Sequence, residues 1–210
     1  ASLTAGEDKT KEISAKVLRK SSIKFSDEPK VLSSCNILII TVPTPIDENN
    51  EPDLSALKEA SNLVGGVMAL GTVVVYESTV YPGVTEGLAG PALEAASGLQ
   101  CGTDFFLGYA PERINPGDQL HTIDKITKVI SGQNEHVTTT LADIFGKITT
   151  GGVFIAKDIR TAEAAKVIEN AQRDINIAFI NEVAKIFQHL DLSIYDVLDA
   201  AVTKWNFLRF

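Results

Sequence analysis

The chain has 210 residues, of which 44% are hydrophobic, 22% charged and 7% aromatic, and its formal net charge at pH 7 is −8. This composition is that of a globular protein with a sizeable core, and its acidic balance argues against nucleic acid as a partner, because binding to phosphates needs a basic face. The longest apolar stretch, LVGGVMALGTVVVY, is broken by glycines and is shorter than the roughly 20 residues that span a bilayer. Residues 1–20 are polar and charged, unlike a signal peptide. We therefore expect a cytoplasmic protein with no membrane partner.

Along the chain, short β-branched runs alternate with helical patterns. We expect strands at 36–42, 72–76, 104–109 and 126–131, and helices at 53–70, 85–97 and 135–148. Asp53 is placed to cap the first of these helices. The alternation predicts βαβ units, and therefore an α/β fold with a doubly wound parallel, Rossmann-like sheet. A dinucleotide-binding sheet opens with a strand and a Gly-x-Gly-x-x-Gly turn. Residues 1–60 contain no such turn, so we expect the sheet to lack its first strand.

From about residue 157 the pattern becomes helical. The segment DIRTAEAAKVIENAQRDINIAFINEVAKIFQHL contains neither proline nor glycine, and SIYDVLDAAV predicts a further helix. We place a domain boundary here, between a sheet domain at 1–156 and a helical domain at 157–210.

The long helix is apolar on more faces than a small helical domain can cover, and such a surface normally marks an interface. We therefore expect a homodimer.

The predicted strands are followed by polar residues, prolines and glycines. In an open parallel sheet, ligands bind outside the carboxyl ends of the strands, and three of these ends carry PTP (43–45), ESTVYPG (77–83) and APERINPGD (110–118). Each has a purely structural explanation: PTP as a stiff turn, Thr79 as a helix cap, Glu112 and Arg113 as a solvated pair. Their joint occurrence on neighbouring strand ends predicts a single ligand cleft.

Lys166 and Asn170 are unusual on a helix that is otherwise so apolar. Residues four apart lie about 40° from one another around a helix, so both side chains point into one site. A lysine in this position can also extend its ammonium to solvent, and the helix alone does not decide between the two.

Six segments in this order resemble the UDP-glucose/GDP-mannose dehydrogenase family, and most closely its UDP-N-acetylhexosamine branch, which serves capsule, Vi-type and O-antigen synthesis. They are GEDKTKEIS (6–14), VPTPIDENNEPDLSALKEA (42–60), VVYESTVYPGVTE (74–86), GYAPERINPGD (108–118), EAAKVIENAQRDINIAFINE (163–182) and TKWNFLRF (203–210). By this resemblance, residues 1–156 are an NAD-binding Rossmann-like domain, incomplete at its N-terminus. Residues 157–210 are then the start of the central helical domain that builds the dimer, incomplete at its C-terminus.

The resemblance implies an enzyme that oxidises the C6 alcohol of a nucleotide sugar to a carboxylate with two NAD⁺, through a thioester on a cysteine. The implied catalytic residues are Thr79, Glu112, Lys166 and Asn170. The implied cofactor contacts are Val42, Pro43, Thr44, Ser78 and Thr79. The implied substrate contacts are Glu112, Arg113, Ile114, Asn115, Lys166, Asn170, Phe207 and Arg209.

Specific roles accompany four of these positions. Thr79 resembles a threonine that helps to position a catalytic water, and Glu112 a glutamate that assists thioester hydrolysis. Lys166 and Asn170 match a lysine and an asparagine that face the reacting C6. A cationic donor near the reacting oxygen is what an alkoxide and a tetrahedral oxyanion require.

The sequence departs from the family pattern in two ways. The UDP-glucose branch reads Pro-Glu-Phe-Leu-x-Glu-Gly where this chain has PERINPG, so Pro116 replaces the second glutamate and UDP-glucose becomes a less expected substrate. The family's nucleophilic cysteine lies in a Gly-Gly-x-Cys segment after KWNF, which this sequence does not contain. Cys35 and Cys101 lie in other contexts, and we assign neither to catalysis, to a disulfide or to a metal site.

We therefore expect NAD-dependent oxidation of a UDP-N-acetylhexosamine to its uronic acid, for surface polysaccharide synthesis, with NAD as the cofactor and no metal. The alternatives within the enzyme class are a UDP-N-acetylmannosamine or a UDP-glucose 6-dehydrogenase. A non-catalytic helical assembly module on a Rossmann-like scaffold is the alternative from another class. We expect the 210-residue chain on its own to be inactive.

Overall fold

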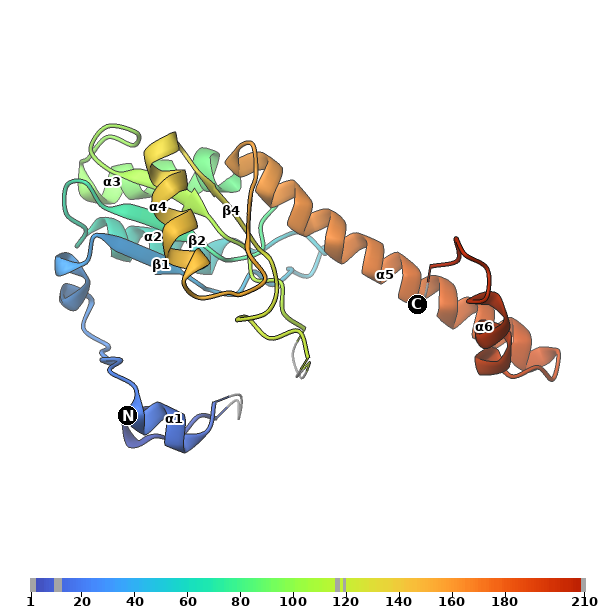
Figure 1. Ribbon diagram of the computed structural model, residues 1–210. Coiled ribbons are helices and arrows are strands. Elements are labelled where there is room, and N and C mark those ends of the chain that lie inside the picture. The colour runs from blue at the N-terminus through green and yellow to red at the C-terminus, as the bar shows by residue number, and fades with distance from the viewer. Residues whose placement is uncertain (1–2, 10–12, 116–117, 119, 209–210) are drawn as a thin grey trace.

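The computed structural model describes residues 3–9, 13–115, 118 and 120–208. Figure 1 shows a sheet flanked by helices, an N-terminal arm, and a long helix that leads away from the sheet. The helical elements are η1 (Leu3–Ala5), α1 (Ala15–Lys20), η2 (Pro29–Ser34), α2 (Ser55–Gly65), η3 (Thr85–Ala89), α3 (Gly90–Ser97), α4 (Glu135–Gly146), α5 (Ile159–His189) and α6 (Ile194–Ala201). The strands are β1 (Ile37–Ile40), β2 (Val73–Tyr76), β3 (Phe106–Tyr109), β4 (Lys128–Gly132) and β5 (Val153–Ile155).

The five strands form one sheet in the order β1-β2-β3-β4-β5. The prediction of an α/β, Rossmann-like sheet is confirmed, but the sheet is mixed rather than wholly parallel. The pairs β1–β2, β2–β3 and β4–β5 are parallel, whereas β4 runs antiparallel to β3. A parallel neighbour needs a crossover, usually a helix that packs on the sheet. The structure shows no helix in the described part of 110–127, and the chain returns along β4 in the opposite direction.

Helices cover both faces of the sheet, as a doubly wound fold requires. On one face, α2, α3 and the first turn of α5 enclose a core that includes Leu57, Leu93 and Ile159. On the other face, α4 packs on β3, β4 and β5, and Leu141 and Phe145 belong to its core. The interior strand β2 contributes to both cores and is buried along its whole length. Such a strand has no solvent-facing side, which explains its uninterrupted apolar sequence.

A pair of glycines allows α4 to lie close to the antiparallel pair of strands. Gly108 and Gly132 are register partners across β3 and β4. A Cβ atom on Gly108 would lie 2.6 Å from a methyl carbon of Leu141, and one on Gly132 would lie 2.5 Å from the backbone nitrogen of Thr138. A larger residue at position 132 would therefore meet the backbone of α4 and push the helix off the sheet, whereas one at position 108 would require the Leu141 side chain to move.

The predicted elements have the right type but shorter bounds. The first predicted helix begins at Ser55 with Leu54 at the N-cap, so the prediction that Asp53 caps it was wrong by one residue. The Asp53 carboxylate still accepts a hydrogen bond from the Ser55 backbone nitrogen at 2.9 Å. The helix predicted at 85–97 contains a π-helical turn, η3, before α3. The three-residue strand β5, VFI, was not predicted because it is too short to show a periodicity.

Helix α5 begins at Ile159, and its N-cap Asp158 accepts a hydrogen bond from the Thr161 backbone nitrogen at 2.7 Å. Its fully buried residues, Ile159, Ala162 and Glu163, all lie in its first turns. The rest of the helix extends away from the sheet domain, and α6 lies near the far end (Figure 1). Ile168 and Ile175 remain 67% and 66% exposed on α5. In the part of the chain that the structure describes, none of the helices has the length and apolar run needed to cross a membrane.

Candidate active site at the carboxyl ends of the strands

A cavity of about 360 Å³ lies at the carboxyl ends of β1, β2 and β3. It is lined by residues 41–44, residues 77–79 and Glu112. Each lining segment follows directly after one of the three parallel strands, which brings their ends to one edge of the sheet. The structure thus brings together six of the predicted site residues, Val42, Pro43, Thr44, Ser78, Thr79 and Glu112.

Hydroxyl groups fasten the loops around this cavity to one another. Ser78 Oγ donates to the Val42 carbonyl at 2.6 Å, and Thr44 Oγ1 donates to the Thr79 carbonyl at 2.6 Å. Beneath them, the buried Tyr109 hydroxyl donates to the Ser78 carbonyl at 3.2 Å, and burial raises the pKa of Tyr109, so it stays a donor. The Ser78 and Thr44 protons are therefore engaged by the protein. A bound molecule would meet their oxygen lone pairs or nearby backbone groups.

Glu112 is held in one orientation by its own loop. Its Oε1 accepts hydrogen bonds from the backbone nitrogens of Arg113, at 2.6 Å, and Ile114, at 2.8 Å. These bonds leave Oε2 as the oxygen that can take a proton or orient a water molecule. Ile114 therefore acts at this site through its backbone.

A buried cation lies behind the cavity. Lys128 Nζ, on β4, is 2.9 Å from Glu77 Oε1 and 3.6 Å from Glu112 Oε2, and the three side chains are 3%, 15% and 33% exposed. Glu77 Oε1 lies at hydrogen-bonding distance from Nζ but outside hydrogen-bonding geometry. Among the described residues, the ammonium is therefore held by electrostatic attraction rather than by a hydrogen bond. The Phe145 ring also lies beneath it, 5.1 Å from the centroid. Our sequence reasoning overlooked Glu77 and Lys128, although a lysine inside the predicted strand ITKVIS was a signal.

Lys166 and Asn170 are both half-buried on the same side of α5. Burial lowers the pKa of the Lys166 ammonium, and the neighbouring charge of Arg173 lowers it further. The charges of Glu169 and Glu112 act in the opposite direction. Lys166 lies close enough to Glu112 for their charges to interact. Helix α5 therefore places the Lys166 ammonium on the side of the strand-end cavity.

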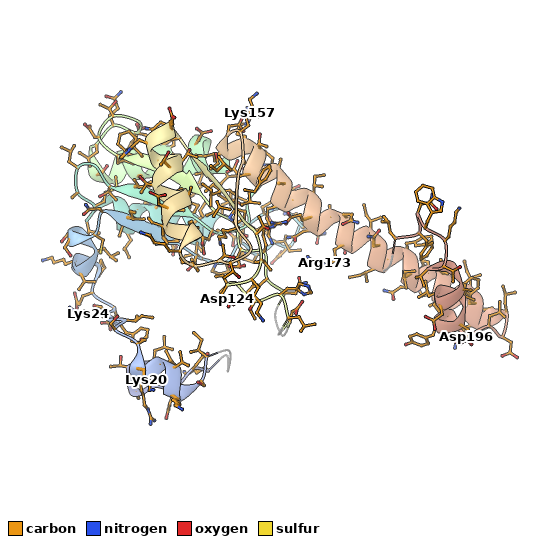
Figure 2. The ribbon with its side chains drawn as sticks, in the orientation of Figure 1. Lys20, Lys24, Asp124, Lys157, Arg173 and Asp196 are labelled. Carbon is orange, nitrogen blue, oxygen red and sulfur yellow. The ribbon has the colours of Figure 1, made fainter. Side chains whose placement is uncertain are left out.

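A second, larger groove continues from this region along α5. It has a volume of about 850 Å³ and is lined by loop residues between 113 and 127, including Asn115, and by α5 residues between 169 and 181. Arg113 crosses it with two contacts to Glu169, Nε–Oε2 at 3.1 Å and Nη2–Oε1 at 2.7 Å. Figure 2 labels Arg173 where α5 leaves the sheet domain and Asp124 on the loop below it.

Glu163, another residue that our sequence reasoning overlooked, attaches α5 to the ESTVYPG segment. The side chain is completely buried, and its two carboxylate oxygens accept hydrogen bonds from the backbone nitrogens of Gly83 and Thr85. Gly83 has a φ of +98°, which favours glycine. One acidic side chain thus fixes the distance between the helix of Lys166 and the loop of Thr79.

Several predicted positions lie elsewhere. Phe207 follows α6, which packs on α5, and in the described part of the chain it belongs to the lining of neither cavity. Arg209 lies outside the described residues.

Cys35 precedes β1 and Cys101 precedes β3, so both are at the amino ends of strands. Cys101 contacts Gln133, and burial raises the pKa of its thiol.

Solved structures of known enzymes share this architecture. A UDP-D-ManNAc dehydrogenase from Pyrococcus horikoshii superposes with a TM-score of 0.84 and 33% identity, over 93% of this chain and 46% of that one. A GDP-mannose dehydrogenase from Pseudomonas aeruginosa superposes with a TM-score of 0.86 at 20% identity, over 98% of this chain and 49% of that one, and supports the fold alone.

Two proteins that are related in sequence are similar to this chain over nearly its whole length. Protein CapL of Staphylococcus aureus is 53% identical over 97% of this chain and 48% of its own length. A UDP-N-acetyl-D-glucosamine 6-dehydrogenase of Pseudomonas aeruginosa is 49% identical over 100% of this chain and 50% of its own length. The chain thus spans about half the length of these relatives. Residues 2–149 match the NAD binding domain, and residues 160–209 the central domain, of a single family. The chain belongs to the UDP-glucose/GDP-mannose dehydrogenase family.

Proposed function

We propose that the full-length protein containing this chain oxidises the C6 alcohol of a UDP-N-acetylhexosamine to the uronic acid with NAD⁺, in the cytoplasm, for surface polysaccharide synthesis. The observation that carries the proposal is the convergence of Thr79, Glu112 and Lys166. Thr79 and Glu112 follow two strand ends and line one cavity, and the charge of Lys166 on α5 interacts with that of Glu112. The name of the relative that is 49% identical to this chain, a UDP-N-acetyl-D-glucosamine 6-dehydrogenase, supports the choice of a UDP-N-acetylhexosamine.

The residues around the cavity fit part of a dinucleotide. A volume of about 360 Å³ is at the lower end for small-molecule sites, so it suits the nicotinamide end rather than the whole molecule. Residues 42–44 and 78–79 offer carbonyls and hydroxyl oxygens to a polar ring substituent and a ribose. Bound NAD⁺ would supply the hydride acceptor. The pyrophosphate would need donors beyond this cavity, because a helix N-terminus with a glycine-rich turn usually provides them.

The side chains have complementary chemical tasks. The Lys166 ammonium would stabilise the C6 alkoxide from which hydride leaves and the tetrahedral oxyanion that forms when water attacks an acyl intermediate. Asn170, one turn further along α5, would hold the same oxygen. Glu112 Oε2 would accept a proton from a water molecule that Thr79 orients. Arg113 and Asn115 would contact the nucleotide sugar in the adjoining groove, and Phe207 and Arg209 remain proposed substrate contacts.

The proposed thioester requires a thiolate beside these groups. Both cysteines of this chain lie at the amino ends of strands, the opposite edge of the sheet from the cavity. Burial also disfavours the thiolate of Cys101. We therefore assign the nucleophile to a cysteine outside this sequence.

We also propose that two copies pair through α5. Apolar side chains, including Ile168, Ile175 and Ile186, are more than half exposed along it, and a helix that extends from its own domain needs a second surface to cover them. The domain division at residue 157 is part of the same proposal, with an NAD-binding domain before it and a helical domain after it.

The test is NADH formation, followed by absorbance, by the full-length protein with a panel of UDP-sugars. We expect UDP-N-acetylglucosamine and UDP-N-acetylgalactosamine to be oxidised with two NADH formed per sugar. Preferred oxidation of UDP-N-acetylmannosamine or UDP-glucose would support the alternatives within the enzyme class. Binding of neither NAD⁺ nor any UDP-sugar, with an intact oligomer, would support a non-catalytic assembly module.

A further inference from the structure

Lys128 has no assigned task in the proposed reaction, although its position is costly. A lysine is almost never fully buried unless it is paired, and Lys128 sits at the end of a core strand with only 3% of its side chain exposed. Its ammonium faces two carboxylates, from the loops after β2 and β3, and both line the cavity. One cation thus faces two anions, and the three side chains together have a net charge of −1.

We propose that Lys128 is a positioning residue that acts through Glu112, and that Glu77 competes with Glu112 for it. Two carboxylates that share a site cannot easily both ionise, and one of them then takes up a proton at higher pH. Lys128 offsets this repulsion. Its Nζ lies 3.6 Å from Glu112 Oε2, while the backbone nitrogens of residues 113 and 114 hold Oε1. This inference rests on the proposed role of Glu112 in catalysis.

The other charges near Glu112 interact with further charged partners of their own. Arg113, the next residue, is paired with Glu169 of α5. Lys166 of α5 interacts with Glu112 but also with Glu169 and Arg173. From α4, the contact to Lys128 is the Phe145 ring, which carries no charge. Substitution of Lys128 or Glu77 should therefore change the pH at which Glu112 ionises most directly.

The two substitutions should act in opposite directions. Lys128→Met removes the cation, so Glu112 should protonate at higher pH, and the acidic limb of the kcat profile should move up by roughly one to two pH units, as expected for a charge within about 4–6 Å. Glu77→Gln removes the competing carboxylate, so Lys128 should stabilise the ionised form of Glu112 more strongly, and the acidic limb should move to lower pH. The double variant Glu77→Gln/Lys128→Met, which removes one charge of each sign, should return the limb towards its original position.

The experiment measures kcat against pH for the full-length protein and these variants, with Lys128→Arg as the conservative substitution and Lys147→Met as the control. Lys147 is exposed at the end of α4, so its loss should leave the profile unchanged. Lys128→Arg should keep the limb within about 0.3 pH units, since the charge is retained. If Lys128→Met does not fold, Glu77→Gln still gives a shift of predicted sign, and the double variant should lie between it and the unmodified protein.

The proposal is overturned if Glu77→Gln and every folded Lys128 variant leave the acidic limb where it is in the unmodified protein. If the unmodified protein oxidises no UDP-sugar, the proposed function fails instead. The ionisation of Glu112 is then followed by NMR of ¹³C-labelled glutamate carboxyls in the same proteins. Opposite shifts of its midpoint in Lys128→Met and Glu77→Gln would support the Lys128 proposal, and unchanged midpoints would refute it.

Discussion

Replacing Glu163 by glutamine should strongly destabilise the protein, although the two side chains have nearly the same shape. Both oxygens of the buried carboxylate accept hydrogen bonds from backbone nitrogens, those of Gly83 and Thr85. Glutamine keeps one acceptor oxygen but turns an NH₂ group towards the other backbone N–H. A hydrogen bond to a charged group contributes about 1.5–3 kcal/mol, and a buried donor without a partner costs about 1–3 kcal/mol. We expect Glu163→Gln to lower the free energy of unfolding by about 2–4 kcal/mol.

The measurement is urea denaturation followed by circular dichroism, with Glu182→Gln as the control on the same helix. Glu182 pairs with Lys185 at 2.6 Å, but the two side chains are 69% and 66% exposed, and an exposed ion pair contributes about 0–1 kcal/mol. Equal stability of the two variants would show that the Glu163 contacts do not hold α5 on the sheet domain. A loss of kcat in Glu163→Gln that exceeds the effect of stability would show that the Thr79–Lys166 spacing matters.

Further predictions concern the long helix and the reaction. Lys166→Ala in the full-length protein should lower kcat by roughly 10²- to 10³-fold, as does the loss of one oxyanion donor, whereas a higher KM at constant kcat would contradict this role. Because burial lowers the pKa of Lys166, activity that needs its ammonium should be lost at a lower pH than for an ordinary lysine, and Lys166→Arg should move this basic limb upward. Light scattering should report twice the chain mass, and Ile175→Asp, on the exposed face of α5, should give a monomer. The 210-residue chain alone should form no NADH with any UDP-sugar, and turnover that Cys101→Ala abolishes would refute our assignment of the thiol.

The sequence predicted the sheet and most of the strand-end cavity because these depend on local patterns. Apolar runs locate buried strands, and the polar loops PTP, EST and PER follow them directly. A parallel sheet then brings the three loops together without any further information. The antiparallel direction of β4 depended on the path of residues 110–127, for which no local pattern was decisive.

The charges inside the protein were harder to predict. Lys128 lies in a strand, Glu77 follows another and Glu163 is in a helix, so neither proximity nor burial follows from their own segments. A buried charge requires a partner, so each of these residues implied a contact that the sequence could not identify. Glu163 shows the difficulty best, because its partners are backbone nitrogens, which every residue except proline carries.

Charges also indicate where the diphosphate of a UDP-sugar should bind. Near the strand ends, Lys128 is engaged by Glu77 and Glu112, and Arg113 by Glu169. The cavity there carries two carboxylates and would repel phosphate. Lys125 and Arg173, by contrast, both line the larger groove along α5, and that groove is the cationic region that an acidic protein needs to hold an anion.

We therefore expect the sugar to face the strand-end cavity and the diphosphate to lie along α5. Lys125→Gln or Arg173→Gln should raise the KM for the UDP-sugar roughly tenfold, equivalent to about 1.4 kcal/mol of binding free energy, and should leave kcat nearly unchanged. Steady-state kinetics at two salt concentrations checks this, since screening should weaken the unmodified protein's binding more than that of the variants. Lys157→Gln, at an exposed position before α5 (Figure 2), is the control. If kcat falls while KM is unchanged, these cations act on the reacting atoms, and the proposed direction of the substrate is wrong.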